Sequence, residues 1–400
     1  MSARNDRELE LSRRQLLAGS AAVTLAASLG LSDDAEAKPQ KKRIHVPRRV
    51  LGKTKRSVPM LLMGQAMSLD PVFDPKLAEC LQLGIDYFDA ADCYGGGRNE
   101  LALGSFLKRT KKRNSVFITS KSDKHDPEGF ERAVDESLRK LGTNYLDMFY
   151  LHGLKDASHL SAKLAGAVDR LKKRGKIRHF GFSCHDHNVA ELLTRAASLS
   201  WVESVMFRYN FGQYGDRELN KAIEAAAHAN IGLIAMKTQR SAASFRGKWV
   251  PFTKAGQWNR QQAVLKAVWA DTRITAVVSH MDTFGKLREN AAAAADKKGL
   301  SRREIEELGR YAAATRALTC DGCDHLCGAQ LPAEMRVGET MRYLMYHDVY
   351  GQQETARQLY RALPEQARNI EAVDFRQALA ACPNAVDIAW HLRRAKQVLG

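Results

Sequence analysis

Short apolar runs alternate with longer amphipathic stretches over most of the chain. Eight runs of four to six residues are rich in large apolar and β-branched side chains, which is typical of buried strands. They cover residues 59–63, 85–88, 116–119, 146–151, 177–182, 202–207, 232–236 and 274–278. Stretches with helical periodicity lie between them, at 99–108, 128–140, 160–174, 188–197, 218–229, 261–270 and 283–295. This alternation predicts an α/β fold, a (β/α)8 TIM barrel over residues 48–299.

An open, doubly wound sheet is the alternative for alternating strands and helices. Such sheets commonly carry a G-x-G-x-x-G turn after the first strand, and none follows the run at 59–63. Beyond the barrel, Ser301 and Glu304 have the spacing of a capping box at the start of a helix. The helical pattern then continues with breaks near Gly351, Pro364 and Pro383. We therefore expect a C-terminal helical domain at residues 300–400.

The first residues have the layout of an export signal. Arg13 and Arg14 precede an apolar, small-residue run at 18–31, and Ala35-Glu36-Ala37 resembles a cleavage site. The alternatives are an uncleaved membrane anchor or a chance amphipathic helix, but the run is too short to span a bilayer comfortably. We expect a twin-arginine signal peptide at residues 1–37, a basic linker at 38–47, and a periplasmic or other extracytoplasmic location without a stable membrane anchor after cleavage. The twin-arginine export machinery would then be a partner, and it carries folded proteins.

The chain is strongly basic, with 62 Lys and Arg residues against 45 Asp and Glu residues and a formal net charge of +17. Residues 38–56 are especially rich in Lys and Arg. Such a run is compatible with nucleic-acid binding. No groove-reading motif is present, and an exported protein meets no genome. A solvated basic surface is the better interpretation, and we expect no nucleic-acid partner.

Polar residues follow the predicted strands, and one tyrosine lies close behind the second strand. In a barrel the carboxyl ends of the strands meet at one rim, where active sites are found. The residues at this rim are Asp89, Lys121, His152, Ser183, Asn210 and Lys237. Tyr94 lies on the loop after Asp89 and is followed by three glycines. Glycine allows turns and close ligand approach that a side chain would block.

Four of these residues have a common chemical use. The ammonium of Lys121 would lower the pKa of the Tyr94 phenol, and the carboxylate of Asp89 would hold that lysine. His152 would orient a carbonyl substrate. Together they could protonate a carbonyl oxygen while hydride reaches its carbon. Each residue also has an ordinary structural alternative. Asp89 could be a helix cap or turn residue and Tyr94 a half-buried loop aromatic. Lys121 could lie on the surface, and His152 could be a core histidine.

Several motifs in this region resemble the aldo-keto reductases. They are GIDYFDAADCYG at 84–95, ITSK at 118–121, YLDMFYLH at 145–152, GKIRHFGFS at 175–183, YN at 209–210 and LREN at 287–290. The resemblance covers the barrel and implies NADPH-dependent carbonyl reduction with Tyr94 as general acid, Lys121 and Asp89 tuning it, and His152 positioning the substrate. It also implies an NADP(H) site, for which the candidate residues are Ser183, Asn210, Lys237, Lys286, Arg288 and Asn290.

The sequence departs from this family mainly around the cofactor. Residues 237–241 replace a proline- and glycine-rich phosphate loop, and residues 279–281 replace an isoleucine-proline-glycine turn. Cys184 and Met206 stand where asparagine and glutamine are common. These departures leave open a second function, a non-catalytic or cluster-dependent electron-transfer protein on a barrel with a degraded nicotinamide site.

The C-terminal region carries three cysteines within eight residues. Cys320, Cys323 and Cys327 have the spacing C-x2-C-x3-C, and Cys382 precedes Pro383. Four thiolates on an irregular loop suit a 4Fe–4S cluster. Zinc, with His325 nearby, and disulfides are the alternatives. This part resembles the iron–sulfur branch of the aldo-keto reductases, which implies these four cysteines as cluster ligands.

The sequence therefore predicts an exported oxidoreductase that interconverts a small carbonyl substrate and its alcohol. NADP(H) and a 4Fe–4S cluster are the expected cofactors. Free NADPH is not expected outside the cytoplasm. Either a nicotinamide leaves the cell tightly bound, or electrons pass through the cluster to a redox partner.

Overall fold

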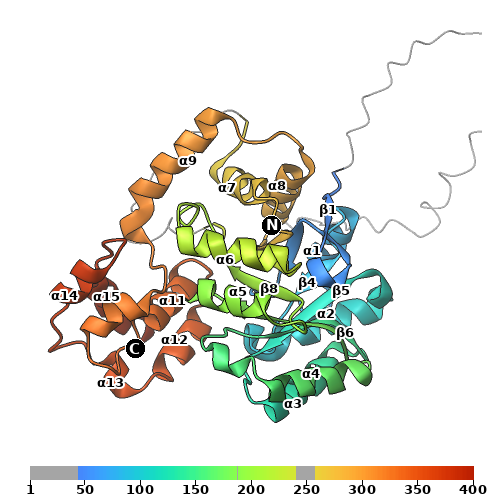
Figure 1. Cartoon of the computed structure of the whole chain (residues 1–400), viewed down its shortest axis with the longest axis horizontal. Helices are drawn as coiled ribbons and strands as arrows, with labels where there is room; N and C mark the ends of the chain where they lie inside the picture. Colours follow the sequence, from blue (N-terminus) through green and yellow to red (C-terminus); the bar gives the residue numbers. More distant parts are fainter. Residues whose placement is uncertain (1–43, 187, 240–256) are drawn as a thin grey trace, which may run out of the picture. The chain divides into compact units, whose positions relative to one another are not determined.

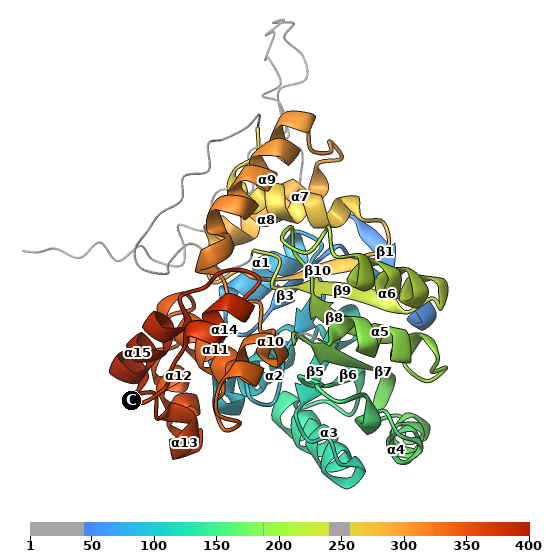
Figure 2. The same ribbon diagram turned by 60° about the vertical axis from the view of Figure 1, so that its left-hand side comes forward.

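The predicted strands form a closed parallel barrel. The computed structural model describes residues 44–186, 188–239 and 257–400, so the expected signal peptide and part of the linker lie outside the described residues. The barrel order is β10-β3-β4-β5-β6-β7-β8-β9, and β10 closes the ring by pairing with both β3 and β9 (Figure 2). The strands are β3 (Leu61–Gly64), β4 (Tyr87–Asp89), β5 (Phe117–Ser122), β6 (Leu146–Leu151), β7 (Ile177–Cys184), β8 (Ser204–Arg208), β9 (Gly232–Met236) and β10 (Ala276–His280). Each overlaps its predicted range, so the (β/α)8 prediction is confirmed.

Helices cover the outside of the barrel (Figure 1). They are α1 (Pro75–Gln82), α2 (Arg98–Thr110), α3 (Pro127–Leu141), α4 (Ala162–Lys173), α5 (Val189–Ala197), α6 (Arg217–His228), α7 (Arg260–Ala270) and α8 (Phe284–Ala295). Sequence-encoded caps fix several of their starts. In α3, the Asp126 side chain accepts a hydrogen bond from Gly129 N and Pro127 follows the cap, which satisfies a free N–H and presets the first turn. Helix α1 was not among the helical stretches predicted from the sequence.

The core of the barrel consists of two apolar clusters, one outside the ring of strands and one inside it. The larger joins the outward faces of the strands to the surrounding helices. The smaller fills the interior and includes Tyr87, Tyr150 and Met206. A hairpin of β1 (Arg48–Val50) and β2 (Ser57–Pro59) adds Leu51 and Val58 to this interior cluster. The interior is therefore packed side chains rather than a pore, which is usual for this fold.

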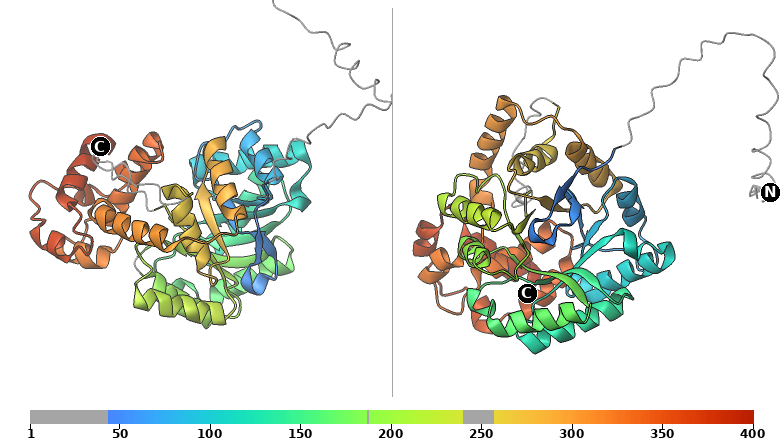
Figure 3. Two further views of the ribbon diagram at one scale, coloured as in Figure 1. Left: turned by 90° about the horizontal axis from the view of Figure 1, so that it is seen from above. Right: turned by 45° about the vertical axis from the view of Figure 1, so that its right-hand side comes forward.

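The C-terminal region is helical, as predicted (Figure 3). Its helices are α9 (Arg302–Thr315), α10 (Asp324–Cys327), α11 (Val337–Asp348), α12 (Gln353–Arg361), α13 (Glu365–Arg368), α14 (Arg376–Ala381) and α15 (Ile388–Leu399). The predicted capping box is confirmed, because Ser301 and Glu304 each bind the other's backbone N–H at the start of α9. Within the described part of the chain, every helix is too short or too polar to cross a membrane.

Candidate active site

Six predicted rim residues lie at or just beyond the carboxyl ends of six successive strands. Asp89 ends β4, Lys121 lies in β5, His152 follows β6, Ser183 lies in β7, Asn210 follows β8 and Lys237 follows β9. Parallel pairing sets their positions along the barrel axis. For example, the register aligns Asp89 with Thr119, two residues before Lys121. The barrel therefore gathers them at one end.

Lys121 is the centre of the predicted acid/base group. Its side chain is 1 % exposed, and its ammonium donates to Asp89 Oδ2 at 2.8 Å and to Ala90 O at 2.7 Å. The same nitrogen lies 3.3 Å from Tyr94 Oη. A buried cation needs a paired anion and further hydrogen bonds to offset its lost hydration. Asp89 supplies the charge, and Tyr94 completes the set of partners.

The loop that carries Tyr94 has an unusual backbone. Gly95, Gly96 and Gly97 have φ angles of 59°, 66° and 83°, which lie in the left-handed region that glycine adopts at little cost. This turn directs the Tyr94 side chain back into the barrel mouth. The Tyr94 and His152 rings meet edge to face, with centroids 6.0 Å apart.

The pKa of Tyr94 shifts opposite to the direction expected from Lys121 alone. Burial raises the pKa of the Tyr94 hydroxyl well above its usual value, and the Asp89 carboxylate adds to that rise. Loss of water outweighs the nearby ammonium, so the phenol keeps its proton. Burial also lowers the pKa of His152 well below its usual value, and Lys121 acts in the same direction. The site therefore holds a protonated phenol beside a neutral imidazole.

Tyr94 and Asp89 line a groove of about 1590 Å³. Met206, Met236 and Val278 give it apolar walls, and Lys286 and Asn290 line it as well. Of the predicted cofactor residues, Ser183, Asn210 and Arg288 are not in the lining of this groove. The Arg288 guanidinium pairs with Glu79 of α1 at 2.5 and 3.0 Å.

Ser183 and Asn210 are buried at the rim, where both already have protein partners. Ser183 Oγ accepts a hydrogen bond from Gly153 N at 3.1 Å, and Asn210 Oδ1 accepts one from Gly212 N at 3.0 Å. The Ser183 hydroxyl proton and part of the Asn210 amide remain for a ligand. Asn210 also lines a second cavity of about 660 Å³, which it shares with Lys237 and Cys320.

The C-terminal region adds residues to the site that the sequence did not reveal. Tyr350 lines the groove with Tyr94, and its hydroxyl lies 3.4 Å from Lys237 Nζ. Tyr346 stacks on Tyr350 with ring centroids 5.7 Å apart. Arg342 donates to His185 Nδ1 at 3.2 Å. These residues come from α11 and the turn after it, so the helical region supplies one wall of the barrel mouth.

The four predicted metal-ligating cysteines come from two segments that one amide joins. Asn384 Nδ2 donates to Thr319 O at 3.0 Å and to Asp321 Oδ2 at 2.7 Å, which ties the segment of Cys382 to that of Cys320. Two backbone N–H groups point at sulfur, Gly322 N to Cys320 Sγ and Val386 N to Cys382 Sγ, each at 3.4 Å. Backbone hydrogen bonds of this kind tune the potential of cluster thiolates.

The thiol loop is also connected to the helix that covers the barrel mouth. Asp324, between Cys323 and Cys327, accepts a hydrogen bond from Gly338 N at 2.7 Å. Gly338 lies in the first turn of α11, where backbone N–H groups have no partner within the helix. The thiol loop therefore caps the helix that carries Arg342 and Tyr346.

The spacing of the four predicted thiols differs from that of a tetrahedral zinc site. A tetrahedral zinc with Zn–S bonds of about 2.3 Å would hold its sulfurs about 3.8 Å apart. Among the described side chains, no three of the four predicted cysteines have their sulfurs within 4.8 Å of one another. A four-iron cluster is larger and spaces its ligands more widely. All seven cysteines carry free thiols, which disagrees with the disulfide alternative.

Burial raises the pKa of Cys320, Cys323 and Cys327. The protein alone therefore keeps these thiols protonated, and the charge of a bound metal group would be needed to ionise them.

Two proteins of known sequence are similar to about half of this chain. Aldo-keto reductase yakc of Schizosaccharomyces pombe, whose name carries NADP(+), is 30% identical over 211 residues, which cover 47% of this chain and 60% of that protein. The uncharacterized oxidoreductase YqkF of Bacillus subtilis is 24% identical over 266 residues, which cover 58% of this chain and 85% of that protein.

Solved structures show the same fold, and a family model identifies the chain. The aldo-keto reductase AKR11C1 from Bacillus halodurans, in its holo form, is 21% identical, with a TM-score of 0.55 over 70% of this chain and 98% of that one. The model described as "Aldo/keto reductase family" matches residues 65–300, which include the rim residues from Asp89 to Lys237. The chain therefore belongs to the aldo/keto reductase family of oxidoreductases.

Proposed function

We propose that this protein is an exported, nicotinamide-dependent oxidoreductase that interconverts a carbonyl and an alcohol and carries a 4Fe–4S cluster on its C-terminal thiols. One observation carries the catalytic part. Lys121 Nζ joins the Asp89 carboxylate, at 2.8 Å, to the Tyr94 hydroxyl, at 3.3 Å, and both partners line the groove. This arrangement supports Tyr94 as the proton donor to a carbonyl oxygen that binds in the groove.

Each residue has a defined part in the reaction. Tyr94 donates its proton to the carbonyl oxygen, and Lys121 stabilises the phenolate that remains until solvent returns a proton. Asp89 fixes Lys121. Neutral His152 offers a hydrogen bond that orients the carbonyl without adding charge. If a nicotinamide binds in the groove, it would supply hydride for the carbonyl carbon, and this hydride together with the proton from Tyr94 would give the alcohol.

The groove suits a long, partly apolar and partly anionic cofactor. Apolar walls at Met206, Met236 and Val278 lie along it, and the ammonium groups of Lys237 and Lys286 line it too. Lys237 has an unusual backbone, with φ of 56°. Lysines can bind the phosphates that the absent glycine-rich loop would otherwise hold. Lys237, Lys286 and Asn290, together with Ser183 and Asn210, are therefore the proposed NADP(H) residues. Arg288 stays a candidate as well. Arg288 is paired with Glu79 and Lys286 with Asp282, so a phosphate would have to displace a carboxylate at either residue.

NADPH binding and turnover test the catalytic proposal. The purified protein should quench or shift NADPH fluorescence on titration and oxidise NADPH with members of a panel of small aldehydes and ketones. Tyr94→Phe should remove turnover while NADPH still binds. Wild-type protein that binds no NADPH and turns over no carbonyl would reject the proposal.

A second candidate function has its own support. The cavity that contains Cys320 also contains Asn210 and Lys237, so the thiol segment lies next to the barrel rim. An electron-transfer protein would use this arrangement with a redox partner and without a nicotinamide. Protein that holds iron and shows visible cluster absorption, yet neither binds NADPH nor turns it over, would favour this second function.

The cluster and the export route can be tested separately. Iron and acid-labile sulfide should be present at about four atoms each per chain in anaerobically prepared protein. Zinc in their place would reject the cluster. Replacement of Arg13 and Arg14 with lysine should retain the protein in the cytoplasm, whereas unchanged export would reject the twin-arginine route.

A further inference from the structure

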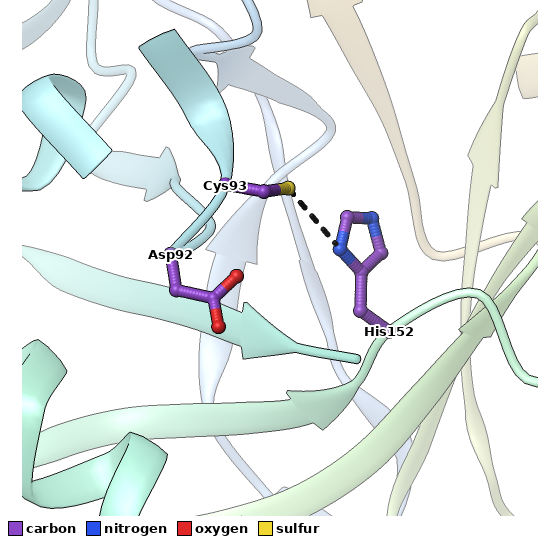
Figure 4. Close-up of side chains that lie close together, drawn as sticks. All are labelled: Asp92, Cys93 and His152. Carbon is purple, nitrogen blue, oxygen red and sulfur yellow. Dashed lines mark hydrogen bonds between the residues drawn. The ribbon is translucent and has the colours of Figure 1, made fainter. Parts of the chain in front are cut away.

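A second group of metal-ligating side chains lies at the barrel mouth. Asp92 and Cys93 come from the loop after β4, and His152 follows β6 (Figure 4). Of the His, Cys, Asp and Glu side chains that the structure describes, these are the only three whose ligand atoms all lie within 4.8 Å of one another. Cys93 Sγ is 3.7 Å from His152 Nδ1. Cys93 is exposed, and the other two are partly buried.

We propose that Asp92, Cys93 and His152 form a binding site for a divalent cation of the zinc class, separate from the C-terminal thiols. A thiolate, an imidazole and a carboxylate are the three protein ligands that zinc takes. The thiolate makes the set unsuitable for Mg²⁺ or Ca²⁺, which prefer oxygen. Three protein ligands leave a fourth position for water or another small ligand.

The distances match such a site closely. With Zn–S and Zn–N bonds of about 2.3 and 2.0–2.1 Å, a tetrahedral angle separates the two donor atoms by about 3.6 Å. The observed Sγ to Nδ1 distance is 3.7 Å. The Asp92 carboxylate oxygen lies within 4.8 Å of both donor atoms, and a side-chain rotation toward the ion would complete the set. Without an ion, an S–H···N hydrogen bond would account for the first distance, and a hydrogen bond with the Ser122 side chain holds the Asp92 carboxylate nearby.

The backbone holds both ligand-bearing segments in place before any ion binds. Asp92 N donates to Lys121 O at 3.0 Å, and His152 N donates to Ser122 O at 2.7 Å. Lys121 and Ser122 are consecutive residues of β5, so one rigid strand fixes both sides of the site. Such preorganisation reduces the ordering that metal binding requires. The ion would take His152 Nδ1 and leave Nε2 carrying its hydrogen.

Metal binding does not depend on the proposed activity and can be measured without substrate. The experiment is an anaerobic Co²⁺ titration of the full-length protein with its C-terminal thiols loaded, followed by equilibrium dialysis and thiolate-to-cobalt absorption. Wild type should bind one more equivalent than Cys93→Ser. Asp92→Asn should weaken that equivalent at least about tenfold. Cys184→Ser is the matched control, because this thiol is buried outside the proposed site, with Asn188 Oδ1 at 3.9 Å and the Asp186 backbone as partners.

Equal cobalt stoichiometry and affinity in wild type and Cys93→Ser would overturn the site and leave a simple S–H···N hydrogen bond. Loss in Cys93→Ser without any effect of Asp92→Asn would overturn the three-ligand set. A second measurement uses wild type alone. Zn²⁺ should protect Cys93 from alkylation in a saturable manner, measured by mass spectrometry of its peptide, and unchanged labelling would also overturn the proposal.

Discussion

His185 should make the stability of this protein sensitive to mild acid. Its ring lies between the barrel and α11, where Nδ1 accepts a hydrogen bond from Arg342 at 3.2 Å. Burial lowers the pKa of His185 to about 4 from its usual 6.5, although Asp186 opposes that shift. The folded state therefore holds this imidazole neutral at a pH where the unfolded chain binds a proton.

The direction and size of the effect follow from linkage. Between pH 6.5 and about 4 the unfolded state binds more protons at this site, so the free energy of unfolding falls as the pH falls. Stability is complete above pH 6.5 and is lost progressively below it. The two pKa values give a loss of about 2 kcal/mol at pH 5 relative to pH 7.5.

Urea denaturation at pH 7.5 and pH 5 measures this loss, with the midpoint and slope determined at each pH. His185→Gln cannot titrate, so its stability should fall by about 2 kcal/mol less than that of wild type over the same interval. His228→Gln is the control, because this ring is 77% exposed and should leave the wild-type loss unchanged. Equal losses in wild type and His185→Gln would refute the assignment of the acid sensitivity to this buried ring.

Three further predictions concern the two proposed chemical sites. Tyr94→Phe should lower kcat by about 10²–10⁴ with the NADPH dissociation constant unchanged, and full activity would exclude Tyr94 as the acid. Lys121→Met should lower the free energy of unfolding by about 3–5 kcal/mol, because it leaves Asp89 buried without its cation. Adding Asp89→Asn should recover most of that stability but no turnover, and a double variant no more stable than Lys121→Met would contradict the pairing. Cys327→Ser should reduce bound iron where Cys184→Ser does not, and equal iron in both would remove Cys327 from the ligand set.

The barrel could be predicted because its information is local. Each strand is a short apolar run, and each following helix has its own period and often its own cap, as with Asp126 before α3. The order of strands and helices then allows few topologies. The rim residues followed from this order alone, since strand ends in a closed parallel barrel share one edge.

Features that depend on contacts between residues far apart in the chain could not be predicted from local sequence patterns. The chain gives no sign that Arg288 has Glu79 as its partner, 209 residues away. The pKa of Tyr94 depends on how completely the loop and Lys121 are buried, which no residue pattern encodes. Tyr343, Tyr346 and Tyr350 did offer a signal, because their spacing places aromatic rings along one side of a helix. The sequence showed such a face but not the barrel mouth beneath it.

The hydrogen bond between Asp324 and Gly338 couples the thiol loop to α11, and through α11 to the barrel mouth. Whatever orders the thiol loop also stabilises the start of α11, and α11 carries the aromatic wall toward Tyr94. If the thiols bind the proposed cluster, linkage requires that a ligand which favours this placement of α11 increases the affinity of the thiols for it, and that the cluster increases the affinity for the ligand by the same factor. A molecule bound at the barrel mouth would then slow the loss of iron, and depletion of iron would weaken binding at the mouth.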